Sequence, residues 1–213
     1  MRTATIQRTT AETDISITLN LDGSGNAQID YPIGFIKHML NTFAKHGLFD
    51  LEVKASGDME VDQHHLVEDT GIVLGQCFAR ALGDRRGIVR VGSCFYPMDE
   101  TSARASVDIS GRAFLVFDAH LSFVPLVCEP IPGSGDPNGP YGTGTFQTDT
   151  VEDFWQGFVS AAYLTLHLEI LRGRSEHHKI KALFKAAARA LRQACEIDRR
   201  AAEAIPSTKG TLG

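Results

Sequence analysis

Apolar and polar residues alternate along several short stretches of the chain. Residues 3–9 (TATIQRT) and 14–21 (DISITLNL) follow this pattern, and residues 50–57 (DLEVKASG) repeat it. Alternation with a period of two is typical of strands that bury one face. The pattern predicts strands at these three stretches and a shorter strand at 27–31, with DGSGN forming a turn before it.

Two longer stretches of the same half have apolar residues at helical spacing. Residues 33–47 carry Ile, Leu and Phe side chains three or four positions apart, and Gly47 suits the C-terminal cap. The stretch HHLVEDTGIVLGQCFARALGD begins at His64, and Gly83 ends its helical period. Both stretches are predicted to be helices.

The second half of the chain repeats this plan. Three strand-like stretches precede a helical stretch, an extended stretch and a final helix, at 91–100, 101–111, 113–121, 151–166, 166–173 and 177–195. When the two halves are aligned, Phe43 meets Phe158, and the pair His64–His65 meets the pair His177–His178. A repeat of this kind indicates an internal duplication.

The duplication predicts an α+β fold. Each half is expected to be a small mixed β-sheet with two helices packed on one face, the first half covering residues 1–93 and the second 94–213. Residues 128–144 (CEPIPGSGDPNGPYGTG) break the symmetry, because they are rich in Pro and Gly and have no periodicity. They are predicted to form a surface loop.

Composition narrows the classes of protein. The 213 residues are 43% hydrophobic and 22% charged, with a formal net charge of -5, which is ordinary for a globular protein. The chain has no run of five Lys or Arg residues, which would have favoured a nucleic-acid partner, and no apolar run long enough to span a membrane. Four scattered cysteines without a C-x-x-C motif and an N-terminus without an apolar segment predict a cytoplasmic protein with reduced thiols.

The histidines are the candidate chemistry. His65 and Glu68 are three residues apart on one helix face, whereas His64 and His65 point about 100° apart. Imidazoles and carboxylates together bind divalent transition metals. A single pair of histidines could equally be a solvated helix start, but a second pair in the same register favours a metal site. His38 and His167 each stand alone, and a single histidine on a half-buried helix or strand is more often a core residue than a ligand.

Several motifs carry a resemblance to a known family. They include RTTAETDISITLNLDGSG, GDMEVDQHHLVEDTGIVLGQCFARALGDRRGI, PMDE, TLHLEILRGRSEHH and IPSTKG, which cover nearly the whole chain in order. The chain resembles the imidazoleglycerol-phosphate dehydratases. This resemblance implies conversion of imidazole glycerol phosphate to imidazole acetol phosphate in histidine biosynthesis. A metal-dependent hydrolase is less favoured, because no H-E-x-x-H motif is present.

The resemblance also implies residue roles. The family binds two Mn²⁺ ions per active site, and the residues at its ligand positions are His38, His64, His65, Glu68, His167, His177 and His178. The catalytic carboxylates implied are Glu12 and Glu68. The residues at its substrate positions are Glu12 and His46, with Arg90, Arg112, Ser207 and Lys209 at the phosphate. Without the resemblance, the C-terminal PSTKG would be interpreted as a frayed tail.

The family's assembly and chemistry set further expectations. Its active site takes ligands from two subunits, and its homo-oligomer is a closed shell of roughly two dozen chains built from trimers. Its metal ions act as Lewis acids that hold the imidazole ring, and a carboxylate base removes a carbon-bound proton. Nitrogen and oxygen ligands without thiolates suit Mn²⁺.

Lys181 is the main departure from the pattern. It stands where the family, like Glu68 in the first half, has glutamate, and a protonated lysine cannot ligate a metal. At ~4 Å and an effective dielectric constant near 20, each like-charge pair costs about 4 kcal/mol. Lys181 could turn away from the site or be neutral, or one metal could be weakly bound or absent. Alternatively, water or another carboxylate could take the place of the glutamate. The alternative to a dehydratase is therefore an impaired homologue with a partial metal site, acting as a ligand-binding or scaffold subunit.

Smaller departures are Lys37, where the family has Asp, and Thr42, where it commonly has Gln, and the link at 128–144 is longer than the family's. No role is assigned to these positions from the sequence.

Overall fold

The structure is a computed structural model that describes residues 2–122, 126–128 and 144–212. The described part of the first half contains β1 (Thr3–Thr9), β2 (Thr13–Asn20), β3 (Ala27–Asp30), α1 (Gly34–Gly47), β4 (Asp50–Gly57) and α2 (His64–Leu82). The described part of the second half contains β5 (Val91–Met98), β6 (Thr101–Asp108), β7 (Phe114–Asp118), β8 (Leu126–Cys128), β9 (Gly144–Phe146), α3 (Thr150–Ala162), β10 (Thr165–Arg172) and α4 (Glu176–Cys195).

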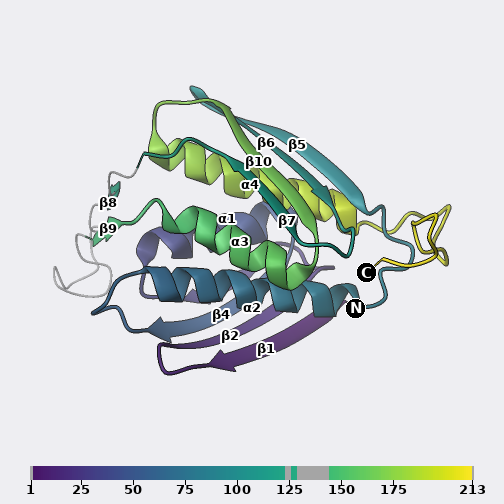
Figure 1. The fold of residues 1–213 in the computed structure, drawn as a ribbon, viewed down its shortest axis with the longest axis horizontal. Coiled ribbons are helices and arrows are strands. Elements are labelled where there is room, and N and C mark those ends of the chain that lie inside the picture. The colour runs from purple at the N-terminus through teal and green to yellow at the C-terminus, as the bar shows by residue number, and fades with distance from the viewer. Residues whose placement is uncertain (1, 123–125, 129–143, 213) are drawn as a thin grey trace.

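The two halves share one topology, which confirms the predicted α+β fold. The first sheet has the order β1-β2-β4-β3 and the second has the order β5-β6-β10-β7. In each sheet the first three strands are antiparallel and the last strand runs parallel to its neighbour. Figure 1 shows the two sheets on the outside of the molecule with the four helices between them.

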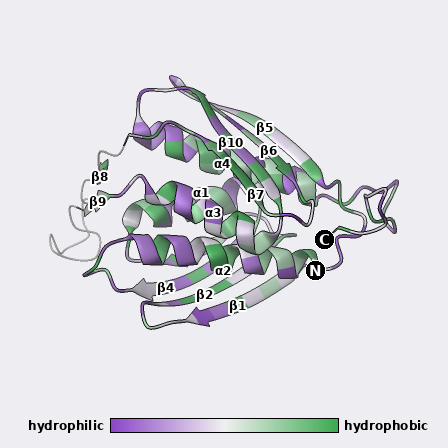
Figure 2. Ribbon diagram, in the orientation of Figure 1, coloured by the Kyte–Doolittle hydropathy of each residue, from purple (hydrophilic) through white to green (hydrophobic). Residues whose placement is uncertain are grey.

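The alternating pattern of the strands buries one face of each sheet against the helices. In β2, for example, Ile15, Ile17 and Leu19 are fully buried, and the intervening residues are exposed or half-buried. Figure 2 shows hydrophobic and hydrophilic residues interleaved along α2, α3 and α4, as expected of helices that bury one side. The helices and the inner sheet faces form one apolar core.

Two of the predicted boundaries are wrong. The helix predicted at 151–166 ends at Ala162, because Tyr163 is left-handed (φ 54°) and Thr165 already pairs with Asp108 in the second sheet. Helix α1 is capped by Leu48 (φ 55°) rather than by Gly47. Glycine is required at 47 for a different reason, since a Cβ there would lie 2.4 Å from the ring of Phe49.

The Pro- and Gly-rich segment is only partly described. Its two ends pair as the short strands β8 and β9, with Cys128 opposite Gly144. The predicted loop at 128–144 otherwise lies outside the described residues. Across the described residues, no helix is both long and apolar enough to cross a membrane.

Candidate metal and substrate site

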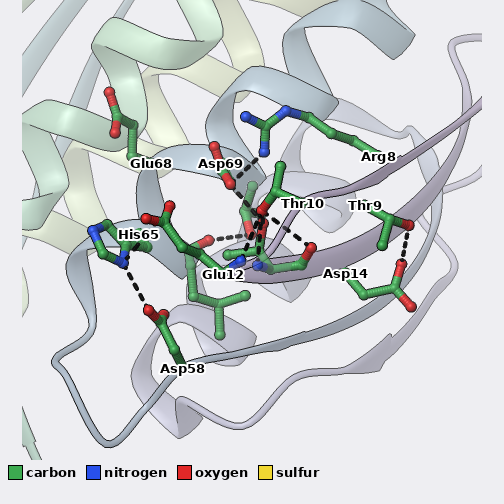
Figure 3. Close-up of polar contacts among 12 residues, drawn as sticks. Arg8, Thr9, Thr10, Glu12, Asp14, Asp58, His65, Glu68 and Asp69 are labelled. Atoms are coloured by element: carbon green, nitrogen blue, oxygen red, sulfur yellow. Dashed lines mark hydrogen bonds and ion pairs between the residues drawn. The ribbon is translucent and has the colours of Figure 1, made fainter.

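His65 begins α2 between two carboxylates. Its Nδ1 donates to Asp58 Oδ2 at 3.0 Å and lies 4.0 Å from Glu12 Oε2 (Figure 3). The hydrogen bond to Asp58 raises the pKa of the His65 imidazole. Since a carboxylate can only accept, the proton is on Nδ1 and the lone pair of Nε2 is available to a metal.

The turn that carries Glu12 is attached to α2. The Oγ1 of Thr10 accepts from the backbone N–H groups of Glu12 (3.1 Å) and Thr13 (3.0 Å), which fixes the turn between β1 and β2. The hydroxyl of Thr13 donates to Asp69 Oδ2 at 2.6 Å, and Arg8 pairs with the same oxygen (Figure 3). Asp69 is buried, so this network ties the Glu12 turn to the helix that begins with the histidine pair.

The second half contains a matching pair. His178 lies in the first turn of α4, where its backbone N–H is capped by Ser175. Its Nδ1 donates to Glu100 Oε2 at 2.8 Å, and this contact lowers the pKa of Glu100 to about 2. Asp99 lies on the other side, 4.0 Å from His178 Nε2. The ligand atoms of these three residues lie within 4.8 Å of one another, close enough to hold a metal ion.

The first histidine of each pair has a different environment in each half. His64 lies between two carboxylates, with Glu68 Oε2 3.7 Å from its Nε2 and Asp153 Oδ2 3.4 Å from its Nδ1. His177 instead lies against α1, its ring centroid 6.1 Å from that of His38. Burial first, and then the positive charge of Lys181, lower the pKa of both His38 and His177.

Arg90 connects the C-terminal tail to the second sheet. Its guanidinium donates to both carboxylate oxygens of Asp108 (2.7 and 2.9 Å) and to the carbonyl of Pro206 (2.8 Å). Its backbone is left-handed (φ 77°), a strained conformation for arginine. The tail that carries Ser207 and the exposed Lys209 is therefore held by Arg90, and the interpretation as a frayed end is wrong.

The comparisons with known proteins all point to one family. The family model described as imidazoleglycerol-phosphate dehydratase matches residues 32–191. This chain belongs to the imidazoleglycerol-phosphate dehydratase family. The dehydratase of Lacticaseibacillus casei is 53% identical over 212 residues, 100% of both chains, and that of Methylorubrum populi is 49% identical over the same length.

Solved dehydratase structures have the same fold. The Staphylococcus aureus enzyme covers 92% of this chain and 99% of its own, with a TM-score of 0.74 and 37% identity. The Pyrococcus furiosus enzyme, solved in complex with (S)-C348, covers 97% and 100%, with a TM-score of 0.75 and 28% identity.

Within this single chain, the candidate residues do not all lie close together. Arg90 donates its backbone N–H to Ala194 near the C-terminal end of α4, whereas His177 lies at the N-terminal end. Between these two residues the helix rises roughly 25 Å at 1.5 Å per residue. The phosphate candidates near the tail and the histidines at the helix start thus lie at opposite ends of α4.

The remaining candidates lie apart from the histidine pairs. His46, in the last turn of α1, packs edge-on against Tyr96 at 5.4 Å, and burial and then Lys185 lower its pKa. Arg112 is exposed in the turn before β7. His167 is half-buried on β10, opposite Ser106, and is not part of the one three-ligand group found among the described residues.

Sequence reasoning missed Asp58 and Glu100, the carboxylates that orient the second histidine of each pair. A sequence signal existed for Glu100. Glu12–Thr13 and Glu100–Thr101 are the same dipeptide at the first turn of each half, and both threonines are buried at the start of the next strand. The duplication could therefore have placed Glu100 beside His178, because the structure has Glu12 beside His65 in the first half.

Proposed function

We propose that this chain converts imidazole glycerol phosphate to imidazole acetol phosphate, a dehydration in histidine biosynthesis. The observation that carries the proposal is the duplicated constellation of a histidine pair at a helix start with a carboxylate on the Nδ1 of its second ring. The alternative of an impaired ligand-binding or scaffold subunit has no support, because relatives 53% identical over the full length are named as the dehydratase.

The donor set suits a divalent cation in the first half. His64, His65 and Glu68 offer nitrogen and oxygen atoms at the start of α2, and Asp58 Oδ1 is buried without a hydrogen-bond partner among the described residues. An unpartnered buried carboxylate oxygen is costly, and a cation held nearby would offset that cost. We assign Mn²⁺ to these ligands together with His38, His167, His177 and His178. When bound, it supplies Lewis-acid stabilisation of the substrate's imidazole ring.

The chain's own groups divide the remaining work. Glu12 accepts the carbon-bound proton, because its exposed carboxylate reaches over His65, and Glu68 is the second catalytic carboxylate. Arg90, Arg112, Ser207 and Lys209 hold the phosphate, and His46 contacts the substrate. Asp58 and Glu100 hold the rings of His65 and His178 in one orientation.

The first prediction is Mn²⁺-dependent turnover by the purified chain. Product formation should stop when a chelator removes the metal and return when Mn²⁺ is added, measured as imidazole acetol phosphate. His65→Asn should abolish turnover, since it removes a proposed ligand. His120→Asn should not, since that ring is 86% exposed and, within the described part of the chain, is paired only with Asp118. Absence of product at every Mn²⁺ concentration would overturn the proposal.

We further propose a cytoplasmic homo-oligomer, a closed shell built from trimers, in which each active site uses two chains. The separation along α4 supports this. A glycerol phosphate is far shorter than the roughly 25 Å between His177 and the end of the helix near Arg90. A second copy would have to bring its phosphate-binding tail to the histidines of the first.

The second prediction is complementation between two inactive variants. His177→Ala and Arg90→Ala should each be inactive alone, and their co-expression should restore about a quarter of wild-type activity. Each shared site takes its histidines from one chain and its phosphate-binding residues from another. In an equal mixture of the two variants, about a quarter of these sites receive an intact set of both. Sites built within one chain would give no recovery. Co-expressing His177→Ala with His178→Ala, which damage the same end, is the matched control and should remain inactive.

A further inference from the structure

The segment Phe146–Thr148 lies among the helix starts that carry the candidate histidines. It covers the last residue of β9 and the two residues after it, and α3 begins two positions later at Thr150. Figure 1 shows β9 at the end of the molecule where α2 and α4 begin. Phe146 and Thr148 are buried and Gln147 is half-buried, so these side chains pack inside the fold. Each of the three is linked to a different histidine-bearing helix.

Gln147 is joined to the start of α2 by two reciprocal hydrogen bonds. The backbone N–H of Gln63 donates to Gln147 Oε1 at 3.0 Å, and the backbone N–H of Gln147 donates to Gln63 Oε1 at 3.1 Å. Gln63 directly precedes His64 and caps α2, and a backbone N–H at a helix start has no partner within the helix. Gln147 therefore fixes the piece of backbone from which the His64–His65 pair projects.

The same residue also holds the start of α3. The carbonyl of Gln147 accepts hydrogen bonds from the backbone N–H of Thr150 (3.3 Å) and from its hydroxyl (2.7 Å). Asp153, in the first turn of α3, faces His64, with 3.4 Å between its Oδ2 and the Nδ1 of the ring. Gln147 thus connects the two helices whose side chains meet at His64.

Phe146 packs on the opposite side, toward α1. Its ring stacks on Phe35 with 4.7 Å between centroids, and Phe35 in turn packs edge-on against His177 at 5.3 Å. His38 follows Phe35 by three residues on α1, and residues three apart share a helix face. The position of the Phe146 ring is therefore coupled to both of these histidines through one aromatic contact.

Thr148 leads to the start of α4. Its hydroxyl donates to the carbonyl of Ser122 at 2.5 Å, and the backbone N–H of Ser122 donates to Glu176 Oε2 at 3.1 Å. Glu176 directly precedes His177 in the first turn of α4, where its other oxygen accepts from Lys179 Nζ at 2.9 Å. Two hydrogen bonds thus connect the segment to the second histidine pair.

We propose that Phe146–Thr148 sets the positions of the three histidine-bearing helix starts relative to one another, with Gln147 as the positioning residue for the His64–His65 pair. A metal ion binds tightly when its ligands are already held in place by the residues behind them. Gln147 acts through the backbone of Gln63 and through α3. The inference rests on the proposed function, since it takes the histidine pairs as Mn²⁺ ligands.

The affinity of the metal-free protein for Mn²⁺, measured by isothermal titration calorimetry, tests this role. Gln147→Leu removes the acceptor of the Gln63 N–H at similar side-chain volume and should raise the Kd for Mn²⁺ by about 10-fold or more. Gln147→Glu keeps an oxygen at the same place and should bind Mn²⁺ nearly as wild type does. Gln156→Leu is the matched control: this exposed glutamine of α3 donates to Ser160 at 3.0 Å, and its loss should leave the Kd unchanged.

The rescue by Gln147→Glu separates positioning from stability, because a merely structural role would lower Tm without changing the Kd. An unchanged Kd in Gln147→Leu would overturn the inference, and so would a Gln147→Glu variant that binds as weakly as Gln147→Leu. If Gln147→Leu does not fold, Gln63→Leu removes the other bond of the reciprocal pair and gives the same test.

The same titrations distinguish this inference from the proposed function. A wild-type protein that binds no Mn²⁺ would refute the metal assignment on which both depend. Wild-type binding with an unchanged Kd in Gln147→Leu refutes the role of Gln147 alone. Wild-type binding that weakens in Gln147→Leu, in a protein without dehydratase activity, refutes the proposed reaction and leaves the role of Gln147 supported.

Discussion

A Glu12→Gln variant is expected to fold and bind Mn²⁺ normally and to lose about 10²–10⁴-fold in kcat, the usual contribution of a positioned general base. The amide has nearly the same shape as the carboxylate but cannot take a proton. Because the Glu12 side chain is 55% exposed, its replacement should leave stability nearly unchanged. Steady-state kinetics should show the loss mainly in kcat, with a small change in KM.

Two comparisons make this result specific. Asp14→Asn removes a neighbouring exposed carboxylate on β2. Among the described residues its side chain accepts one hydrogen bond, from Thr9 at 2.8 Å, so this variant should keep its turnover. Glu68→Gln should lose activity and metal together, since Glu68 is a proposed ligand, whereas Glu12→Gln should lose activity alone. Near wild-type turnover in Glu12→Gln would assign the proton transfer to another group.

The regular elements could be predicted because each is encoded locally. The alternation of Ile15, Ile17 and Leu19 identifies β2, and the spacing of the apolar residues in α1 identifies a helix. The histidine pairs could be predicted as sites because the chain contains the same unusual dipeptide twice in one register. Family motifs supplied the rest of the candidate set, including the tail that Arg90 holds.

What the sequence could not provide depends on contacts between distant segments. Glu100 orients His178 across 78 positions of the chain, and only the pairing of β5 with β6 and the packing of α4 bring them together. Asp58 lies close to His65 in the chain, but nothing in a short polar turn indicates that its carboxylate faces the ring. The end of α3 likewise depends on β10 joining β6, which shortened the predicted helix.

A Gly71→Ala variant is expected to lose about 3 kcal/mol of stability, at the upper end of the cost of overpacking a core. A Cβ at this position would lie 2.1 Å from the carbonyl oxygen of Phe154, which is backbone of α3 and cannot rotate away. A Cβ added at Gly75 would lie 2.4 Å from the carbonyl oxygen of Phe158, and one added at Gly157 would lie 2.9 Å from that of Glu68. With Gly71, these glycines form a seam of close contact between α2 and α3. The two helices therefore touch backbone to backbone.

Helix propensity alone predicts the opposite sign, since alanine is favoured over glycine by about 1 kcal/mol within a helix. Thermal unfolding measures the balance, and a loss of about 3 kcal/mol corresponds to a fall of about 6–12 °C in Tm for a chain of this size. Gly83→Ala is the control for packing: among the described residues, no atom beyond the chain neighbours lies within 4 Å of a Cβ there, and only the backbone conformation (φ 61°, ψ -131°) opposes alanine, at a cost of roughly 1–3 kcal/mol. An unchanged or higher Tm in Gly71→Ala would mean that α2 and α3 can separate freely.

The same seam also positions the candidate metal ligands. His64 and Glu68 lie on α2, and Asp153, which faces His64, lies on α3. Because the added methyl group must move α3 away from α2, Gly71→Ala should widen the 3.4 Å contact between His64 and Asp153 and weaken Mn²⁺ binding below the unfolding temperature. Gly83→Ala, at the far end of α2, should not affect the metal. Close packing of small residues thus connects the stability of the fold to the geometry of the site.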